Sequence, residues 1–228
     1  MSKTCSILQP HYLPWIGYFD LIKRSDIFVY LDDVQYVKRE WKNRNKIRKK
    51  PTSRDVKWLS VSVEKDACKK QINQVEIFDI SKWRNDHINS IKEIYGFSPR
   101  FTEFSGDIFS IIEDKSIKNL SDLNIKLIQK GCEFLNINSN FVLSSEFGFK
   151  EKREYKLLEI CKKLRCNIFL ANNKTCEYAD KKIFYDENIE IRPQNFNQKI
   201  YKQKYKEINL DWLPYLSWID YIFNKELN

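Results

Sequence analysis

The sequence predicts an α/β fold in which a mostly parallel sheet is flanked by helices. Residues 4–9 (TCSILQ) and 26–34 (DIFVYLDDV) are apolar at consecutive positions, as is typical of parallel strands that are covered on both faces. A helix is expected between them, because Pro14 suits the first position of a helix and the next apolar residues share one face: Ile16, Phe19, Leu21 and Ile22. A β-α-β unit therefore opens the chain.

The middle of the chain predicts two further strands and several helices. Residues 56–63 alternate as a strand does, and 71–78 (QINQVEIF) are expected to form another short strand. A helix is expected to begin at Ser81 as N-cap and to end at Gly96. Residues 106–137 contain two more helical stretches, of which the second, SDLNIKLIQK, also has a Ser at its N-cap.

The last third repeats the strand and helix alternation. A strand at 140–148, an amphipathic helix at 150–166 and the strand NIFLAN form a second β-α-β pattern. A strand at 189–196 and a short helix at 213–224 follow, and the segment NQKIYKQKY before that helix is expected on the surface or against a pocket. Because no repeat or linker-like segment separates the halves, we expect one α/β domain over residues 1–228.

Composition limits the class of protein. No uncharged apolar run reaches the roughly 18 residues of a membrane-spanning helix, and the N-terminus MSKTCSILQP lacks the apolar core of a secretory signal. The six cysteines have no paired spacing and only two histidines are present, so we expect free thiols, a cytoplasmic location and no dedicated metal site.

The positive charge is local. The chain has 40 Lys and Arg against 31 Asp and Glu, a net charge of +9, and residues 38–54 carry nine basic residues and one Glu, which gives +8. If this segment is extended, one face is wholly cationic, with Lys42, Arg44, Lys46 and Arg48, and the other carries Trp41, Asn43, Asn45 and Ile47. Such a face attracts phosphate and would hold a diphosphate while Trp41 stacks a base, although a solvated basic loop has the same composition.

Known phosphate and nucleophile motifs are absent. The chain has five glycines and no Walker loop, no G-x-G-x-x-G, no G-x-S-x-G and no H-E-x-x-H. The first strand, Pro-containing turn and helix resemble the opening of nucleotidyltransferase-type enzymes, with Gly17 kept in WIGY but without their histidines. Because those histidines would stabilise charge on a transferred phosphate, adenylating or nucleotidyl-transferring chemistry is the second choice.

Four ionisable residues are candidates for catalysis. His11 directly follows the first strand, where a packing role is awkward, and could act as a base or bind a phosphate or carboxylate. Asp32 and Asp33 end the second strand and could bind a metal, orient His11 or accept a hydrogen bond from a substrate amine. Alternatively, they could simply form a turn. His87 lies on a predicted helix, where a single histidine is usually packed. Since the carboxyl ends of parallel strands share one edge, residues 9–15 and 32–36 are expected to meet there.

The stretch QPHYLPWIGYFDLIKRSDIFVYLDDVQYVKREWKNRNKI resembles the opening signature of the WbqC-like protein family. The resemblance continues in WLSVSV, WRNDHINSIKEIYGFSPRF, LSDLN, SSEF, YKQKY and LSWIDYIFN, so it covers nearly the whole chain. One departure is the segment Ala171, Asn172 and Asn173 in place of an expected Gly-rich turn, which does not favour a close backbone approach to a ligand there.

The resemblance implies a bacterial enzyme of O-antigen or other surface-polysaccharide synthesis. It suggests transfer of an acyl or aminoacyl group to an amino sugar carried on a nucleotide, with both substrates as small-molecule partners and no cofactor. His11 or His87 would remove the amine proton, Asp32 or Asp33 would fix the imidazole tautomer, and Arg44 and Lys46 would hold the diphosphate. The expected substrate-binding residues are Gln9, Tyr12, Trp15, Tyr18, Gln35, Tyr36, Trp41, Asn43, Arg44 and Lys46.

A binding module is the remaining alternative. The basic segment could grip nucleic acid or an anionic glycan, and such binding would weaken steeply with salt. Nucleic acid is the less favoured partner, because His11, the tyrosines and the paired aspartates have no purpose in a purely electrostatic groove.

Overall fold

The computed structural model describes residues 2–51, 53–78, 82–206 and 208–225, and these residues form two compact units. Unit 1 comprises residues 1–9, 17–33 and 137–197, and unit 2 comprises 10–16, 34–136 and 198–228. Each unit is assembled from separated stretches, so no single cut divides the sequence between them. The expectation of one domain over the whole chain stays a prediction.

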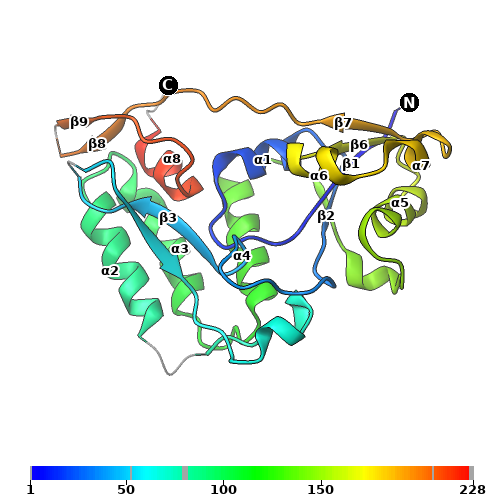
Figure 1. Cartoon of the computed structure of the whole chain (residues 1–228). Coiled ribbons are helices and arrows are strands. Elements are labelled where there is room, and N and C mark those ends of the chain that lie inside the picture. Colours follow the sequence, from blue (N-terminus) through cyan, green and yellow to red (C-terminus); the bar gives the residue numbers. More distant parts are fainter. Residues whose placement is uncertain (1, 52, 79–81, 207, 226–228) are drawn as a thin grey trace. The chain divides into compact units, whose positions relative to one another are not determined.

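Unit 1 is built on a five-stranded parallel sheet (Figure 1). Its strands, in spatial order, are β5 (Asn140–Leu143), β2 (Ile27–Tyr30), β1 (Thr4–Leu8), β6 (Ile168–Ala171) and β7 (Glu190–Pro193). Helix α1 (Ile16–Lys23) connects the neighbouring parallel strands β1 and β2. The predicted α/β class and the opening β-α-β unit are therefore confirmed.

Helices cover both faces of this sheet. On one face Cys5, Val29 and Phe169 pack in a buried cluster with Ile160 of α5 (Arg153–Lys163) and Phe184 of α7 (Lys181–Tyr185). On the other face, the ring of Tyr18 in α1 lies 5.4 Å from that of Phe28 in β2. Because alternate strand residues point to opposite faces, both sets must be apolar, which explains the continuous apolar runs in the sequence.

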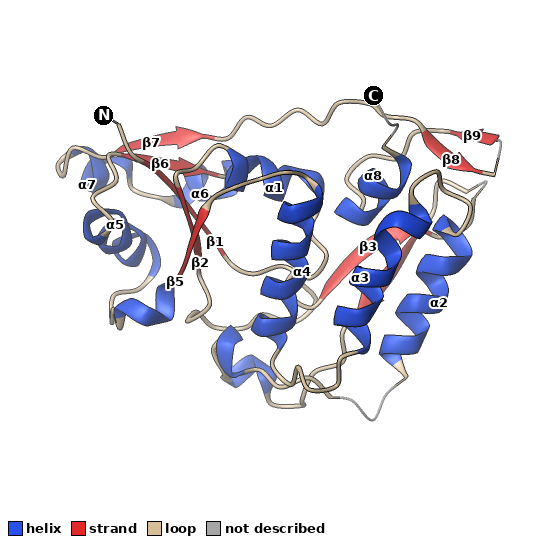
Figure 2. Ribbon diagram, turned by 180° about the vertical axis from the view of Figure 1, so that it is seen from behind, coloured by secondary structure: helices blue, strands red, loops and turns tan. Residues whose placement is uncertain are grey.

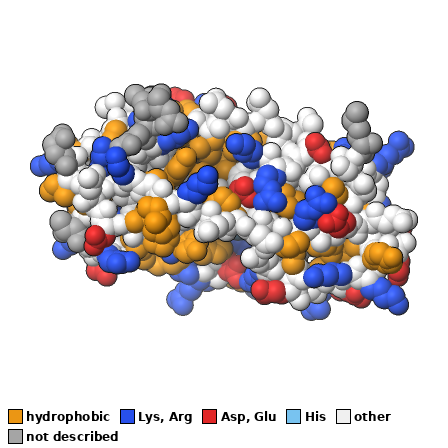
Figure 3. All heavy atoms as spheres, turned by 90° about the horizontal axis from the view of Figure 1, so that it is seen from above, with side chains coloured by type: hydrophobic (Ala, Val, Ile, Leu, Met, Phe, Trp, Pro, Cys, Tyr) orange, Lys and Arg blue, Asp and Glu red, His pale blue; other side chains and the backbone are white. Residues whose placement is uncertain are grey.

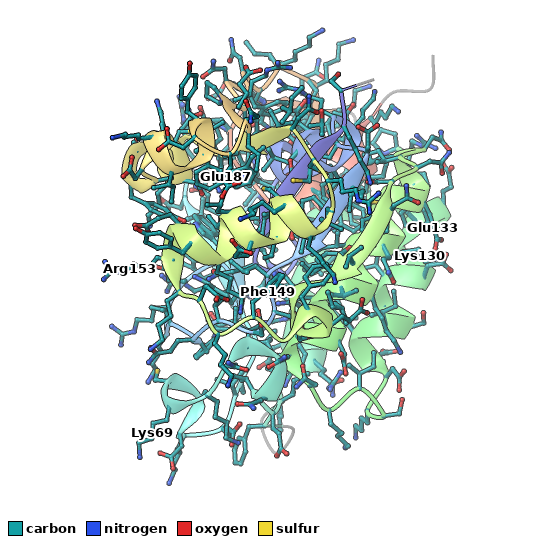
Figure 4. The ribbon with its side chains drawn as sticks, turned by 90° about the vertical axis from the view of Figure 1, so that its right-hand side faces the viewer. Lys69, Lys130, Glu133, Phe149, Arg153 and Glu187 are labelled. Atoms are coloured by element: carbon teal, nitrogen blue, oxygen red, sulfur yellow. The ribbon has the colours of Figure 1, made fainter. Side chains whose placement is uncertain are left out.

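The segment after α7 is also tied to α5. Glu187 accepts a hydrogen bond from Lys162 of α5 at 2.9 Å, and Figure 4 shows Glu187 beside this helix, which begins at Arg153. Helix α6 (Asn173–Tyr178) begins directly after β6, where the Asn172 side chain accepts a hydrogen bond from the Thr175 amide. The segment that departs from the family pattern therefore serves as a helix cap.

Unit 2 combines helices with small antiparallel sheets (Figure 2). Its helices are α2 (Trp83–Tyr95), α3 (Phe101–Glu113), α4 (Leu120–Phe134) and α8 (Trp218–Asn224), and its strand pairs are β3 (Arg44–Arg48) with β4 (Val56–Ser60) and β8 (Gln203–Tyr205) with β9 (Ile208–Leu210). Helix α3 packs between α2 and α4. On α4, Lys130 and Glu133 lie one turn apart and form an ion pair (Figure 4).

Three local predictions in unit 2 need comment. The strand expected at 71–78 is wrong: a 3₁₀ turn, Ile72–Gln74, occupies this segment and only single bridges flank it. The N-cap of α4 is Asn119 rather than Ser121, and its side chain accepts from the Ser121 amide at 2.7 Å. Gly96 caps α2 as predicted, whereas Ser81 lies outside the described residues.

Candidate functional site

Two buried asparagines of unit 2 shape the turn after β1. Asn45 of β3 donates its side-chain amide to the carbonyls of Tyr12 (3.2 Å) and Leu13 (2.8 Å). Asn124 of α4 donates to the Pro10 carbonyl at 3.0 Å. Leu13 adopts a φ of 42°, a conformation that L-residues rarely take. These hydrogen bonds hold the strained turn and thereby fix where the Tyr12 side chain points.

Tyr12 and His87 form a buried pair. The Tyr12 hydroxyl lies 2.9 Å from Nδ1 of His87, and both side chains are almost inaccessible to solvent. Burial lowers the pKa of His87 to about 3, against an opposing hydrogen bond to the backbone of Ser60, and burial raises the pKa of Tyr12. Both groups are therefore uncharged at neutral pH, and contacts to two separate segments fix the orientation of the imidazole ring.

His11 is also held uncharged. Its half-buried ring has a pKa lowered to about 3, first by burial and second by the positive charge of Lys42. Lys42 is itself 5% exposed and donates to Glu40 at 2.8 Å. An imidazole with so low a pKa is a weak proton acceptor, so it can take a proton only from a group that has become strongly acidic.

The predicted alternation of the basic segment is only partly correct. Within β3, Asn45 and Ile47 are buried as one face of the strand, and Arg44 and Lys46 lie on the other. The expected wholly cationic face is wrong, because Lys42 is buried and Arg48 is 2% exposed. Arg48 donates instead to the Gln203 side chain and to the Asp211 carbonyl, partners more than 150 residues away.

An aromatic and cationic surface remains where β3 meets β4. The rings of Trp41 and Trp58 lie 5.5 Å apart, and the guanidinium of Arg44 lies 4.2 Å from the Trp58 ring centre. Each of the two indoles is 41% exposed. Nε of Arg44 is buried and has no hydrogen-bond partner among the described residues. The residue as a whole is half-buried, and its positive charge attracts an anion. We call Trp41, Trp58, Arg44 and Lys46 the indole–arginine surface.

A cleft of about 430 Å³ opens between β4 and α2 in the same unit. Trp58 borders both this cleft and the indole–arginine surface, and His87 also lines the cleft. Its remaining lining residues are Lys57, Leu59, Ser60, Trp83, Asp86, Asn89, Ser90 and Glu93. The cleft thus joins aromatic walls, an uncharged imidazole and two carboxylates on one helix face.

Asp32 and Asp33 belong to unit 1, where they form a buried network at the carboxyl edge of the sheet. Asp32 accepts hydrogen bonds from the hydroxyls of Ser144 (3.0 Å) and Ser145 (2.7 Å). Asp33 accepts from Ser144 and from the ammonium of Lys156, the latter at 2.5 Å. Leu31 follows β2 and donates to the Leu8 carbonyl. That residues 9–15 and 32–36 meet at this edge stays a prediction. That an aspartate orients a histidine stays a prediction.

The remaining predicted residues divide between the two units. In unit 1 the Tyr18 hydroxyl donates to the Gln9 carbonyl at 3.0 Å. In unit 2 Gln35 donates to the Cys68 carbonyl and Asn43 to the Val61 carbonyl, whereas burial raises the pKa of Tyr36 to about 12. The Trp15 ring contacts that of Tyr215 at 5.4 Å. Their roles in binding stay predictions.

Comparison with known proteins assigns the chain to a protein family. The family model described as the WbqC-like protein family matches residues 9–228, which include all of unit 2 and all of unit 1 after β1. The chain belongs to this family. A relative in Mycobacterium tuberculosis, the uncharacterized protein Rv1507c, is 29% identical over 222 residues, covering 97% of this chain and 94% of the relative. No solved structure matches the chain.

In this member of the WbqC-like family, sequence reasoning missed several residues of the cleft. Trp58 lies in the strand predicted at 56–63 and Trp83 in the helix predicted from Ser81 to Gly96, and the sequence pattern gives Asp86 and Glu93 no role. Asp86, Asn89, Ser90 and Glu93 are spaced so that they lie on one face of a helix. This spacing was the feature of the sequence from which the polar wall of the cleft could have been predicted. The strand opposite them could not be paired with α2 from sequence alone.

Two features are absent from the described part of the chain. No group of three or more His, Cys, Asp or Glu side chains there is arranged to hold a metal ion. No helix there is both long and apolar enough to cross a membrane.

Proposed function

We propose that this WbqC-like protein transfers an acyl or aminoacyl group to the amine of a nucleotide-linked amino sugar during synthesis of bacterial surface polysaccharide. The family membership supports the biological setting. The observation that carries the proposal is the continuity, through Trp58, of the indole–arginine surface with the cleft that His87 lines. The first suits a nucleotide diphosphate and the second suits a sugar.

The indole–arginine surface supplies two kinds of recognition. Exposed indoles stack on bases and on the apolar faces of sugars, which is worth about 1–3 kcal/mol for each stacked base. Arg44 and Lys46 supply positive charge on the same face of β3, and both residues are half-buried. A guanidinium that already stacks on Trp58 is oriented before the diphosphate arrives, which reduces the entropy cost of binding.

The reaction would join the sugar nitrogen to the carbonyl carbon of the acyl donor and break the bond from that carbon to the leaving group. The nitrogen then carries an extra proton, which His11 or His87 removes and later delivers to the leaving group or solvent. The low imidazole pKa sets the order of events, because the amine proton becomes acidic enough only after the carbon–nitrogen bond forms.

Isothermal titration of the purified protein with nucleotide sugars tests the binding step. We expect Trp58→Ala and Arg44→Gln each to weaken binding of a uridine diphosphate sugar by about tenfold, since each removes roughly 1–2 kcal/mol of stacking or charge-assisted hydrogen bonding. Arg54→Gln is the matched control, because Arg54 is an exposed residue of the same basic segment.

The catalytic step is tested by product formation. Incubation with an amino-sugar nucleotide and acyl-CoA or aminoacyl donors should yield an N-acylated sugar detectable by mass spectrometry. The proposal is wrong if nucleotide sugars do not bind, or if Trp58→Ala and Arg44→Gln bind as well as Arg54→Gln.

An adenylating or nucleotidyl-transferring activity is the second candidate, and the sheet of unit 1 favours it. Strand β1 has β2 on one side and β6 on the other, so the chain reverses direction across the sheet beside β1. Ligands of open parallel sheets bind outside the carboxyl ends of strands at such a point. Binding of ATP, without binding of nucleotide sugars, would favour this candidate.

A further inference from the structure

The cleft between β4 and α2 differs in charge from the rest of the chain. Whereas the protein carries a net charge of +9, the cleft is lined by two acids, Asp86 and Glu93, and by one base, Lys57. His87 adds no charge at neutral pH, since burial lowers its pKa to about 3. The lining therefore has a net charge of −1, which favours a cationic ligand over an anionic one.

The walls of the cleft suit a sugar ring. Trp58 and Trp83 supply flat apolar surfaces, and Ser60, Asn89 and Ser90 supply groups that can bind hydroxyls. Trp83 is 4% exposed, and its indole N–H has no hydrogen-bond partner among the described residues. The Trp83 ring therefore contributes apolar surface to the cleft.

The nearby arginines do not neutralise the acids. The guanidinium of Arg84 stacks on Trp83 at 4.7 Å, but it donates to the carbonyls of Ile112 and Ile117, which commits it to the loop after α3. Arg44 stacks on Trp58 at 4.2 Å. The two carboxylates are exposed and lie two turns apart on α2, so they remain available to a ligand cation.

We propose that the β4–α2 cleft binds the acceptor sugar through its protonated amine, with Asp86 and Glu93 as the anionic partners and Trp58 and Trp83 as the walls. This inference rests on the proposed function, which supplies the amino sugar, and it identifies where and in which charge state the amine is recognised. A cavity of about 430 Å³ lies within the range of roughly 300–1,000 Å³ that is typical of small-ligand pockets.

Recognition of the ammonium has a kinetic consequence. Acylation converts the cationic amine into a neutral amide, so the product loses its attraction to Asp86 and Glu93 and gains the bulk of the acyl group. The cleft thus prefers substrate to product. Reaction proceeds from the small fraction of bound sugar whose amine has lost its proton.

The test uses free sugars, so that neither a nucleotide nor an acyl donor is needed. Glucosamine, N-acetylglucosamine and glucose are titrated into the full chain at pH 6.5, and binding is followed by tryptophan fluorescence and by NMR of the sugar. We expect glucosamine to bind about threefold to fivefold more tightly than the other two, since its single ammonium pairs with one exposed carboxylate at a time and such a pair contributes up to about 1 kcal/mol. The preference should fall at pH 9.5, where the amine is largely neutral.

Variants assign the preference to the cleft. In the double variant Asp86→Asn/Glu93→Gln the preference should fall to within about twofold, whereas Glu113→Gln, an exposed acid on α3, should retain it. The inference is overturned if glucosamine shows no preference, if no sugar binds at 50 mM (roughly the weakest affinity that such contacts would give), or if the double variant keeps the preference.

Failure of the proposed function would give a different pattern. Suppose that glucosamine binds preferentially, that this preference requires Asp86 and Glu93, and that nucleotide sugars do not bind. The assignment of the cleft is then supported, and the proposed reaction on a nucleotide sugar is wrong. If nucleotide sugars bind through Trp58 and Arg44 while the free sugars are not distinguished, the reaction stands and the ammonium recognition falls.

Discussion

At the scale of single residues, His11 and His87 both lie near the candidate site, and both are uncharged at neutral pH. Burial holds both pKa values at about 3 in the folded chain, whereas an exposed histidine titrates near 6.5. Below about pH 6.5 the unfolded chain binds protons that the folded chain does not. The free energy of unfolding must therefore fall as the pH drops from 6.5 towards 3, and this contribution is complete above pH 6.5.

This linkage predicts a pH-dependent loss of stability. Each histidine should lower the free energy of unfolding by about 1.4 kcal/mol per pH unit below 6.5. Urea denaturation at pH 6.5, 6.0, 5.5 and 5.0 measures the slope for the wild type and for His87→Gln. The variant should be less stable at pH 7 because it disturbs the Tyr12 hydrogen bond, but its slope should be smaller by about one proton. Equal slopes would show that His87 titrates normally in the folded chain.

At the scale of elements, two helical glycines of unit 2 give opposite predictions. A Cβ on Gly96, at the end of α2, would lie 2.6 Å from the Lys92 carbonyl oxygen, so the backbone would have to shift. A Cβ on Gly106, an exposed residue within α3, would meet no atom within 4 Å. Since alanine is favoured over glycine in a helix by about 1 kcal/mol, only the second position can gain from the replacement.

Thermal unfolding of the two variants tests this contrast. Gly106→Ala should raise the melting temperature by a few degrees, roughly 2–4 °C for a chain of this size. Gly96→Ala should lower it. A rise in both would mean that the end of α2 relaxes without cost.

The elements that sequence predicted correctly are those fixed by local pattern. Strands β1 and β6 are short apolar runs, and α5 has an apolar stripe, so composition and period sufficed. The strand prediction for 71–78 failed because Val75 and Ile77 alternate as in a strand, whereas Ile72, three residues before Val75, lies in a 3₁₀ turn, and all three side chains are buried. Tertiary packing decides which secondary structure such short apolar runs adopt, and their own sequence does not reveal the residues they pack against.

The sequence singled out some residues that lie near the candidate site, but none of their pairings. His87 was singled out, but its partner Tyr12 lies 75 residues away and is reached only through the turn that Asn45 and Asn124 hold. Arg48 was assigned to a solvent-exposed cationic face, whereas side-chain and carbonyl acceptors near the C-terminus draw it inside. Such pairings arise from the fold and leave no local periodicity.

At the scale of the whole molecule, the distribution of charge separates the small-ligand functions from nucleic-acid binding. Basic side chains on the face shown in Figure 3 are interspersed with hydrophobic and neutral ones. Two of the nine basic residues at 38–54, Lys42 and Arg48, are buried and cannot contact a phosphate backbone. The segment therefore offers fewer phosphate contacts than its composition suggests.

Salt dependence measures this difference. If DNA bound through residues 38–54, at most seven side chains would contact phosphates, and log K would change with log salt by a slope no steeper than about −6. Fluorescence anisotropy with a labelled duplex should instead show only weak binding that disappears at 0.15 M salt, while uridine diphosphate sugars still bind. Tight DNA binding at that salt concentration would favour the binding-module alternative.

The interleaving of the two units constrains how the chain folds as it is synthesised. Strand β1 is made before the other strands of its sheet, and its neighbour β6 follows more than 160 residues later, after all of α2, α3 and α4. Unit 2 likewise waits for α8 near the end of the chain. Neither unit can complete its core until these later elements have been made, so its first apolar strands stay open to misfolding for longer than in a domain built from one continuous stretch.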